Sequence, residues 1–429
     1  MPGSSSPLDG VRVLDLSQVF SGPYATRILG DLGADVVKLE SIGRPDPERG
    51  EVAPARPAPG RYPDNEPGDE PYNRAARFVE YNRNKRGITL DLRSSDGLRL
   101  CRRLVALADV VIENFSVGVM DRLELGYDAL RSLRQDIILV SLPAFGDTGP
   151  EQRYVAFGPQ QECLTGLVGV SGYSEDRPVS TSVYYPDPMV AVFAVSAIIT
   201  ALLHRHATGA GQHIKFAQRE TMLFTVPEPV LERCITGRVM GPLANGHPRY
   251  APHGCYPCAG EDSWVVIAVT SEEEWRALCG VLARPELLDD PRFTNAAGRR
   301  EHRADLDAAI ETWTRSVEHH DAMARLQAAG VPAGAVLNTA ELVSDPHYAA
   351  RGFLPTVEYG AGVGRHPTMG FPWRFSRTPA SIRMPTPLLG EHTREVLGEL
   401  LGVTAEEYEA LERAGVTGTN PVGAAKRSS

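Results

Sequence analysis

The first 142 residues alternate between short apolar runs and helical patterns, and this alternation constrains the fold more than any other feature. Apolar runs of four to seven residues predict strands, and the longer segments between them predict helices. The strands are expected at 11–16, 34–40, 88–92, 109–113 and 136–142, with a further strand at 212–216, and the helices at 22–32, 95–107 and 127–134. Repeated strand–helix–strand units form a parallel sheet with helices on both faces. The sequence therefore predicts an α/β fold.

The chain is long enough for a second domain. Its 429 residues exceed what one ordinary core holds. The pattern changes after about residue 225, where a strand-like stretch at 255–269 is followed by amphipathic helices at 271–282, 297–315 and 319–329. This region predicts a smaller α+β domain.

Composition excludes several classes of protein. The net charge of −10, without a basic stripe, argues against a nucleic-acid partner. Six scattered cysteines do not form a disulfide framework. The apolar run 189–203 is shorter than a bilayer span, and it contains Ser196 and Thr200, so a core helix is expected and no membrane partner. The N-terminus shows no signal pattern, so a cytoplasmic enzyme is expected.

One aspartate has an unusual setting. Asp187 lies between Pro186 and Pro188, after a strand-like segment at 179–183 and before the apolar run 189–203. The prolines fix the backbone on both sides of the carboxylate, and the sequence predicts Asp187 as the N-cap of a helix that begins at Pro188. The helix dipole and backbone N–H groups are then expected to hold Asp187 ionised. A plain N-cap and a functional carboxylate both fit this pattern.

Three common chemistries are not favoured by the motifs. The turn at 17–23 lacks G-x-G-x-x-G, and Pro23 removes a backbone donor, which argues against a nicotinamide oxidoreductase. Cys255 and Cys258, with His253 nearby, have no second ligand pair, so no metal site is predicted. No G-x-S-x-G stands at a predicted strand end, which argues against a serine hydrolase.

Polar and basic segments lie instead at the ends of predicted strands, where open parallel sheets bind ligands. These segments are 18–20, 82–86, 113–115 and Arg122. Together they suit an anionic, partly aromatic ligand, with Arg and Lys on phosphates and a Phe ring against a base.

The same segments carry a resemblance to a known family. The blocks at 7–15, 30–40, 84–92, 109–115, 208–212 and 387–393 closely resemble the class III CoA-transferases, the family of formyl-CoA transferase and carnitine CoA-transferase. The resemblance runs from residue 7 to about residue 415. It implies an interlocked homodimer whose subunits each have a large Rossmann-like domain and a small domain. We therefore expect a large domain at 1–224, the small domain at 225–330, and a return to the large domain at 331–429.

The resemblance also implies an activity and a site. CoA would move from an acyl-CoA to a carboxylic acid, and both are substrates, with no permanently bound cofactor. Asp187 matches the family's catalytic residue and would attack the thioester as a nucleophile. CoA would contact seven residues: Gln18, Val19, Leu90, Arg93, Asn114, Phe115 and Arg122.

Some positions depart from the family pattern and leave alternatives open. The racemase branch of the superfamily uses a histidine that would fall at 158–160, and none stands there, so an α-methylacyl-CoA racemase is the second choice. A catalytically inactive CoA-binding protein is the third. An aromatic and an acidic position near the acceptor read Phe157 and Gly158. Candidate substrate contacts are Phe20, Tyr184, His247 and His253, with Tyr184 and Tyr185 expected to point in opposite directions.

Overall fold

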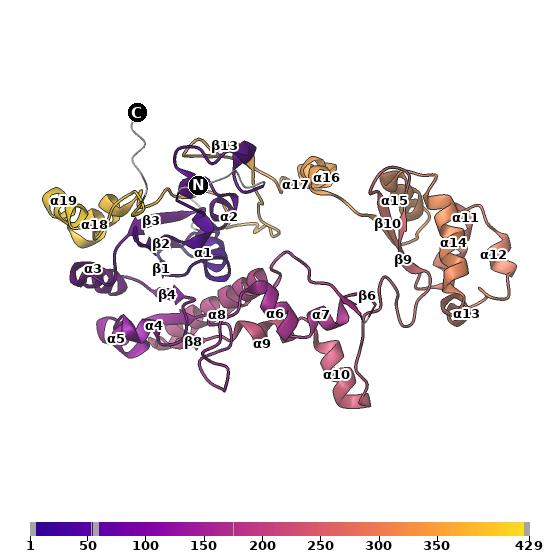
Figure 1. Cartoon of the computed structure of the whole chain (residues 1–429), viewed down its shortest axis with the longest axis horizontal. Coiled ribbons are helices and arrows are strands. Elements are labelled where there is room, and N and C mark those ends of the chain that lie inside the picture. Colours follow the sequence, from indigo (N-terminus) through magenta and orange to yellow (C-terminus); the bar gives the residue numbers. More distant parts are fainter. Residues whose placement is uncertain (1–5, 53, 55–59, 175, 424–429) are drawn as a thin grey trace. The chain divides into compact units, whose positions relative to one another are not determined.

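The computed structural model describes residues 6–52, 54, 60–174 and 176–423 (Figure 1). Contacts divide the described chain into two compact units. Unit 1 lies within Met1–Thr165, Thr181–Pro227 and Gly352–Ser429, and unit 2 within Gly166–Ser180 and Glu228–Arg351. The domain boundaries expected at 224 and 330 stay a prediction.

A six-stranded parallel sheet forms the centre of unit 1. Its strands are β1 (Arg12–Asp15), β2 (Asp35–Glu40), β3 (Lys85–Thr89), β4 (Val110–Glu113), β5 (Ile138–Ser141) and β8 (His213–Lys215), in the order β3-β2-β1-β4-β5-β8. Every neighbouring pair is parallel. The predicted α/β class is thus confirmed, although the strand expected at 88–92 begins three residues earlier.

Side chains alternate between the two faces of this sheet, and each face has its own core. On one face, residues such as Leu14 and Val111 pack with helices α3 (Ser95–Val105), α5 (Tyr127–Leu133), α18 (Thr393–Leu401) and α19 (Ala405–Arg413). On the other face, residues such as Val13 and Val110 pack with α1 (Ser21–Asp31) and α8 (Pro186–Thr208).

Helix α8 contains the apolar run expected to form a core helix. It is long and apolar enough to cross a membrane by length and composition, and it is the one such helix in the described chain. Its buried residues, including Val190, Ala194 and Ile198, pack in the same core as α1. Val192 and Leu203 on its other side are exposed. The helix therefore packs into the core with one face, as a core helix does, and exposes the other face.

The two ends of the chain meet in unit 1. The Thr89 hydroxyl donates to Gly418 O and accepts from Gly418 N. The Asp91 N–H donates to Val416 O, and the Thr89 N–H donates to the hydroxyl of Thr393. Residues separated by more than 300 positions in the sequence therefore complete the edge of the sheet at β3.

The remaining elements of unit 1 are short. They are α2 (Ala76–Tyr81), α4 (Val119–Arg122), α6 (Gly158–Leu164), α9 (Gln218–Leu223), the 3₁₀ turns η1 (Pro47–Arg49), η2 (Pro63–Asn65) and η3 (Pro71–Asn73), and the antiparallel pair β12 (Thr356–Tyr359) and β13 (Gly364–Pro367). The three 3₁₀ turns lie between β2 and α2.

Unit 2 is an α+β structure. Its antiparallel sheet has the order β11-β10-β9, from β9 (His253–Pro257), β10 (Trp264–Ala268) and β11 (Ala333–Ala335), and a smaller pair joins β6 (Gly172–Ser174) and β7 (Arg177–Pro178). The helices are α7 (Leu167–Val170), α11 (Glu272–Val281), α12 (Glu286–Asp289), α13 (Ala296–Glu301), α14 (Arg303–Thr314), α15 (His319–Ala328), α16 (Thr339–Ser344) and α17 (Pro346–Arg351). Helix α10 (Pro227–Thr236) begins at the boundary of the units. The single helix expected at 297–315 is two helices, because His302 leaves helical geometry.

Candidate active site

Asp187 lies inside the first turn of α8, not at its N-cap. The helix begins at Pro186, and Tyr185 is the N-cap. Proline suits the first helical position because its φ angle is already helical and its missing N–H has no partner there. Pro186 takes that position, which moves Asp187 to the second. The expected N-cap is therefore wrong by two residues, while the proximity of the carboxylate to the helix start is correct.

Two helix starts converge on the Asp187 carboxylate. The backbone N–H of Ser21, the first residue of α1, donates a hydrogen bond to it, and so does its own N–H. The Ser21 N–H is among the groups that a helix start leaves without an internal partner, while the Asp187 N–H also donates to Tyr184 O at 3.1 Å. The carboxylate is nevertheless buried, since Asp187 is only 9% exposed.

Burial decides the ionisation of Asp187. Removal from water raises its pKa, the nearby charge of Glu48 raises it further, and the hydrogen bonds from Ser21 and from its own backbone lower it. The result is a pKa raised from 3.8 to about 7. The expectation that the helix dipole holds Asp187 ionised is therefore wrong, because desolvation outweighs the donors.

A glycine lies directly against this carboxylate. A Cβ atom on Gly158 would stand 2.6 Å from Asp187 Oδ2 and 3.1 Å from Tyr184 Cβ. A side chain at 158 would thus displace the carboxylate or the backbone beside it. The sequence marked 157–158 as a departure from the family pattern, and the structure shows that Gly158 makes room for Asp187. Phe157, its neighbour, is 58% exposed.

The segment before Asp187 is strained and tied down. Ser182 and Tyr184 have positive φ angles of 59° and 53°, which side-chain-bearing residues adopt rarely. This geometry ends any extended strand, so the strand expected at 179–183 is wrong. The buried carboxylate of Glu162 accepts from both the N–H and the hydroxyl of Thr181. Tyr184 contacts Gly158, while Tyr185 is 39% exposed.

Aromatic rings lie beside the start of α1. Phe20 stacks on Tyr81, with ring centroids 4.1 Å apart and planes 5° apart, and Tyr24 meets both rings edge-on. Burial raises the pKa of Tyr81, and the charge of Asp187 adds to this shift. Tyr81 therefore shares an environment with Asp187, and Phe20 reaches that environment through Tyr81.

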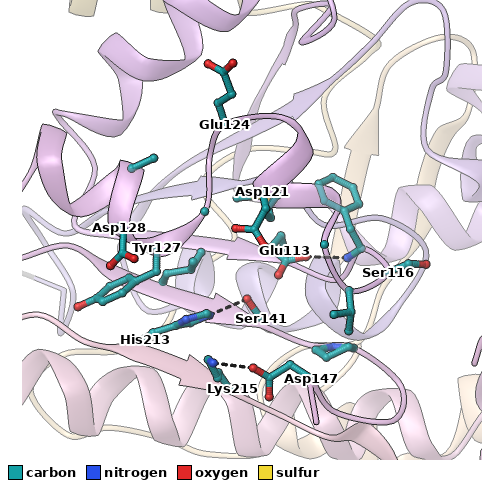
Figure 2. A pocket seen from close by; sticks show the side chains of 18 residues that line it. Glu113, Ser116, Asp121, Glu124, Tyr127, Asp128, Ser141, Asp147, His213 and Lys215 are labelled. Carbon is teal, nitrogen blue, oxygen red and sulfur yellow. Dashed lines mark hydrogen bonds and ion pairs between the residues drawn. The ribbon is translucent and has the colours of Figure 1, made fainter. Parts of the chain in front are cut away.

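A cavity of about 780 Å³ opens at the carboxyl ends of β4, β5 and β8 (Figure 2). Ser141 Oγ lies 2.9 Å from His213 Nε2, and Lys215 pairs with Asp147. Of the predicted CoA contacts, Phe115 lines this cavity. Its wall is rich in carboxylates, from Glu113, Asp121, Glu124, Asp128 and Asp147. Such a wall does not suit the phosphates of CoA.

Two predicted CoA contacts meet at the centre of the sheet. The Gln18 N–H donates to Asn114 Oδ1 at 2.8 Å, and Asn114 Nδ2 donates to Gln18 O at 2.6 Å. Gln18 follows β1 and Asn114 follows β4, the two strands between which the strand order reverses. Ligands of open α/β sheets bind at this switch point.

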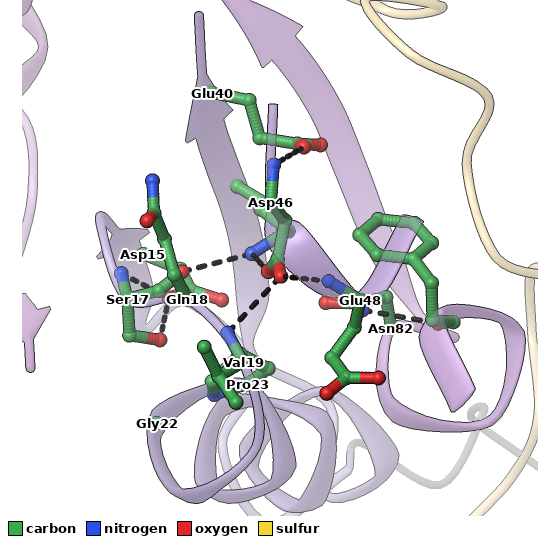
Figure 3. A network of polar contacts seen from close by, with 12 residues as sticks. Asp15, Ser17, Gln18, Val19, Gly22, Pro23, Glu40, Asp46, Glu48 and Asn82 are labelled. Atoms are coloured by element: carbon green, nitrogen blue, oxygen red, sulfur yellow. Dashed lines mark hydrogen bonds and ion pairs between the residues drawn. The ribbon is translucent and has the colours of Figure 1, made fainter. Parts of the chain in front are cut away.

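A buried network holds the loop after β1 (Figure 3). Val19 has a φ of 68°, a strained value for a β-branched residue. The carboxylate of Asp46 accepts from the Val19 N–H at 3.1 Å and from the Glu48 N–H at 3.0 Å, and Lys38 Nζ lies 3.1 Å from it. The Asp46 N–H donates to Glu40 Oε1. The network thus fixes Val19 and places Glu48 near Asp187.

The other predicted CoA contacts lie near strand ends in unit 1. Leu90 is fully buried behind β3. Arg93 is largely exposed and pairs with Asp91. The Phe115 N–H donates to Glu113 Oε2, and Arg122 is the last residue of α4. The role of these four residues in binding CoA stays a prediction.

The basic segment 82–86 does not form a ligand site. Arg83 makes a two-point pair with Asp31 and Lys85 pairs with Asp15, and both basic side chains are almost fully buried. Arg86 pairs with Asp35. These cations form ion pairs within the fold. The segment lies at the start of β3 and not after its end, where ligands of a parallel sheet bind. The interpretation that they bind phosphates is therefore wrong.

His247 and His253 lie in unit 2, and their rings have local partners. His247 Nδ1 accepts from the N–H groups of Arg249 and Tyr250, and His253 Nδ1 lies 2.9 Å from Asn245 O. Their predicted substrate contacts stay a prediction. Within the described residues, metal-type ligands gather at Glu318, His319 and His320. Both ring nitrogens of His319 already face carboxylates there, at 2.7 Å and 3.0 Å.

Several residues near Asp187 were missed by the sequence reasoning. They are Ser21, Glu48, Arg77, Tyr81 and Gly158. The sequence analysis noted Gly158 only because the family places an acidic residue near this position. No local pattern marks the others, because each reaches Asp187 through tertiary contacts.

Comparison with known proteins identifies the family of this chain. Residues 8–393 match CoA-transferase family III. The chain belongs to this family. It is 32% identical over 407 residues to the succinyl-CoA–D-citramalate CoA-transferase of Chloroflexus aurantiacus, covering 95% of this chain and 97% of the relative. It is 33% identical over 400 residues to the succinate–glutarate CoA-transferase of Agrobacterium fabrum, covering 93% and 97%.

A solved structure shows the same fold. The CaiB/BaiF family protein from Brucella suis has a TM-score of 0.83 and 32% identity, covering 92% of this chain and 100% of that chain. The resemblance seen in the sequence blocks is confirmed. This family III CoA-transferase is an enzyme that uses CoA thioesters and carboxylic acids as substrates.

Proposed function

We propose that this CoA-transferase works through a covalent intermediate on Asp187. The observation that carries the proposal is the placement of one buried carboxylate where two helix starts meet. It lies in the same unit as the paired loops of Gln18 and Asn114 at the switch point of the sheet. A carboxylate suits this reaction because it can become an anhydride and then a thioester.

The proposed reaction passes through two covalent intermediates on Asp187. An Asp187 carboxylate oxygen attacks the carbonyl carbon of the acyl-CoA, and the C–S bond breaks to give an aspartyl–acyl anhydride and CoA thiolate. The thiolate attacks the aspartyl carbonyl carbon, which releases the donor acid and leaves an aspartyl-CoA thioester. An acceptor carboxylate repeats these steps in reverse order. Each attack places negative charge on a carbonyl oxygen, and the N–H groups of Ser21 and Asp187, which face the carboxylate, are the proposed donors to it.

The raised pKa of Asp187 fits both roles of this carboxylate. A weakly solvated carboxylate is a stronger nucleophile than one held by water, and burial protects an anhydride from hydrolysis. We propose that CoA lies along Gln18, Val19, Leu90, Arg93, Asn114, Phe115 and Arg122, with the Gln18–Asn114 pair at the centre.

We also propose the interlocked homodimer and a cytoplasmic location. Helix α10 supports the dimer, because none of its residues is buried and it exposes Val230, Leu231 and Ile235. A helix with an exposed apolar face needs a partner surface. Sedimentation of the purified protein tests the dimer directly.

Trapping tests the covalent step. The enzyme is incubated with an acyl-CoA and hydroxylamine, and the peptide that contains Asp187 is analysed by mass spectrometry. A hydroxamate at Asp187, lost in Asp187→Asn, is the expected result. Glu113 serves as an internal comparison, since burial raises its pKa to about 7 as well. Exchange by a folded Asp187→Asn protein, or equal labelling of Glu113, would refute the assignment.

A further inference from the structure

A half-exposed arginine lies beside the candidate nucleophile. Arg77, on α2, holds its guanidinium 4.7 Å from the centre of the Tyr184 ring and has a side-chain hydrogen bond with Tyr184. Its Nη1 lies 3.8 Å from Glu48 Oε1, beyond hydrogen-bond distance. The Arg77 side chain is 52% exposed. The Tyr184 ring thus positions the guanidinium, while Glu48 is too far away to form a two-point ion pair with it.

Tyr184 connects Arg77 to Asp187. The Asp187 N–H donates to Tyr184 O at 3.1 Å, and Tyr184 Cβ packs against Gly158 next to Asp187 Oδ2. Tyr81 also connects Arg77 with Asp187, because the charges of Arg77, Glu48 and Asp187 all act on the pKa of its hydroxyl. Arg77, Glu48 and Asp187 therefore surround one small region of unit 1.

Three other arginines of this region are already engaged. Arg49 is almost fully buried and makes a two-point pair with Glu40, and Arg83 does the same with Asp31. Arg27 pairs with Glu80 at 2.6 Å. Arg77 is the cation of this group that can take a carboxylate from solution.

We propose that Arg77 binds the second carboxylate of the exchanged acid, so that this enzyme acts on dicarboxylic acids and their mono-CoA thioesters. The inference rests on the proposed function of Asp187. In a dicarboxylic acid, one carboxyl group becomes the thioester while the other stays ionised and needs a cation. A guanidinium offers two parallel N–H donors to a carboxylate. The Tyr184 ring fixes the guanidinium, so less side-chain entropy is lost on binding.

Glu48 defines the unliganded state of this subsite. In the absence of substrate, the partly buried Glu48 carboxylate partly neutralises the charge of the Arg77 guanidinium at 3.8 Å. A substrate carboxylate displaces Glu48 from Arg77 by forming shorter, two-point hydrogen bonds. An acid of the same length without the second carboxylate gains nothing from this exchange.

Matched acceptor pairs test the proposal. Exchange is measured with succinate against butyrate and with glutarate against valerate, in the native enzyme, Arg77→Met and Arg77→Lys. Arg99→Met is the control, because Arg99 is an exposed arginine on α3 paired with Asp96. We expect Arg77→Met to lower kcat/KM for the dicarboxylates by about 10- to 100-fold, the usual loss for one charged hydrogen-bonding partner. Butyrate and valerate are expected to change little, and Arg77→Lys to restore part of the loss.

Three outcomes would overturn the inference. They are an equal loss on both members of a pair, no loss in Arg77→Met, and a native enzyme that does not prefer the dicarboxylate. Hydroxamate trapping separates this failure from failure of the proposed function. If Asp187 is labelled but Arg77→Met leaves kcat/KM unchanged, only the Arg77 subsite is refuted. If no acyl-CoA gives a label on Asp187, the mechanism on which the subsite rests is refuted as well.

Discussion

Replacing Asp187 by asparagine is expected to stabilise the protein, and to do so more as the pH rises. Asparagine keeps the size of the side chain but cannot ionise. The folded protein raises the pKa of Asp187 from 3.8 to about 7, so ionisation is less favourable in the folded than in the unfolded chain. The free energy that ionisation costs the native protein is absent from the variant.

The size of the effect follows from the two pKa values. Each pH unit between them corresponds to about 1.4 kcal/mol, so the full difference is about 4 kcal/mol. Well below pH 3.8 both states are protonated and the native protein carries no penalty. The penalty grows as the unfolded chain ionises, reaches about 2 kcal/mol at pH 5, and levels off near about 4 kcal/mol above pH 7.

Chemical denaturation measures this difference. The native protein and Asp187→Asn are unfolded in urea at pH 5, 6, 7 and 8, followed by far-UV circular dichroism, and compared at each pH. The difference in unfolding free energy is expected to increase by about 2.5 kcal/mol from pH 5 to pH 8. A difference that is constant over this range, or that favours the native protein at pH 8, would refute the argument that burial governs Asp187.

Two further predictions concern activity. The value of kcat/KM for the acyl-CoA is expected to fall as the pH drops through about 7, because attack needs ionised Asp187. Glu48→Gln should move the midpoint of this pH profile downward, since it removes a charge that raises the pKa of Asp187. Initial rates measured across pH test this, and a midpoint that Glu48→Gln does not move would contradict it. Gly158→Ala is expected to lower exchange more than tenfold and to destabilise the fold by about 1–3 kcal/mol, since the new Cβ meets Asp187 Oδ2 at 2.6 Å. Gly280→Ala on α11 is the matched control, because nothing lies within 4 Å of its added Cβ; equal rates in the two variants would show that the contact is not tight.

The parallel sheet could be predicted from the sequence because its determinants are local. The segment 34–40 has apolar residues at its centre and a glycine just before it, and it forms β2. Asp187 could also be found, because two prolines and a helix start mark it within five residues. The family resemblance then gave it a role.

The electrostatics of the site could not be predicted in this way. The pKa of Asp187 depends on burial beneath segments as distant as Ser21 and Glu48, and no neighbouring residue reports that burial. The basic segment 82–86 was misassigned for the same reason, since Asp15 and Asp31 neutralise it from other elements. The strand expected at 179–183 failed because its alternation of β-branched residues with serine carries no sign of the positive φ angles at Ser182 and Tyr184.

The junction between Thr89 and Gly418 has a consequence for how the protein is made. During synthesis, the β3 edge emerges from the ribosome more than 300 residues before the segment that completes it. The strands of unit 1 must wait, exposed, while the intervening chain is translated, whereas the continuous stretch Glu228–Arg351 of unit 2 has most of its partners as soon as it appears. The small unit is thus in a position to fold first, and synthesis of the segment around Gly418 sets the earliest moment at which the β3 edge of the sheet can be completed.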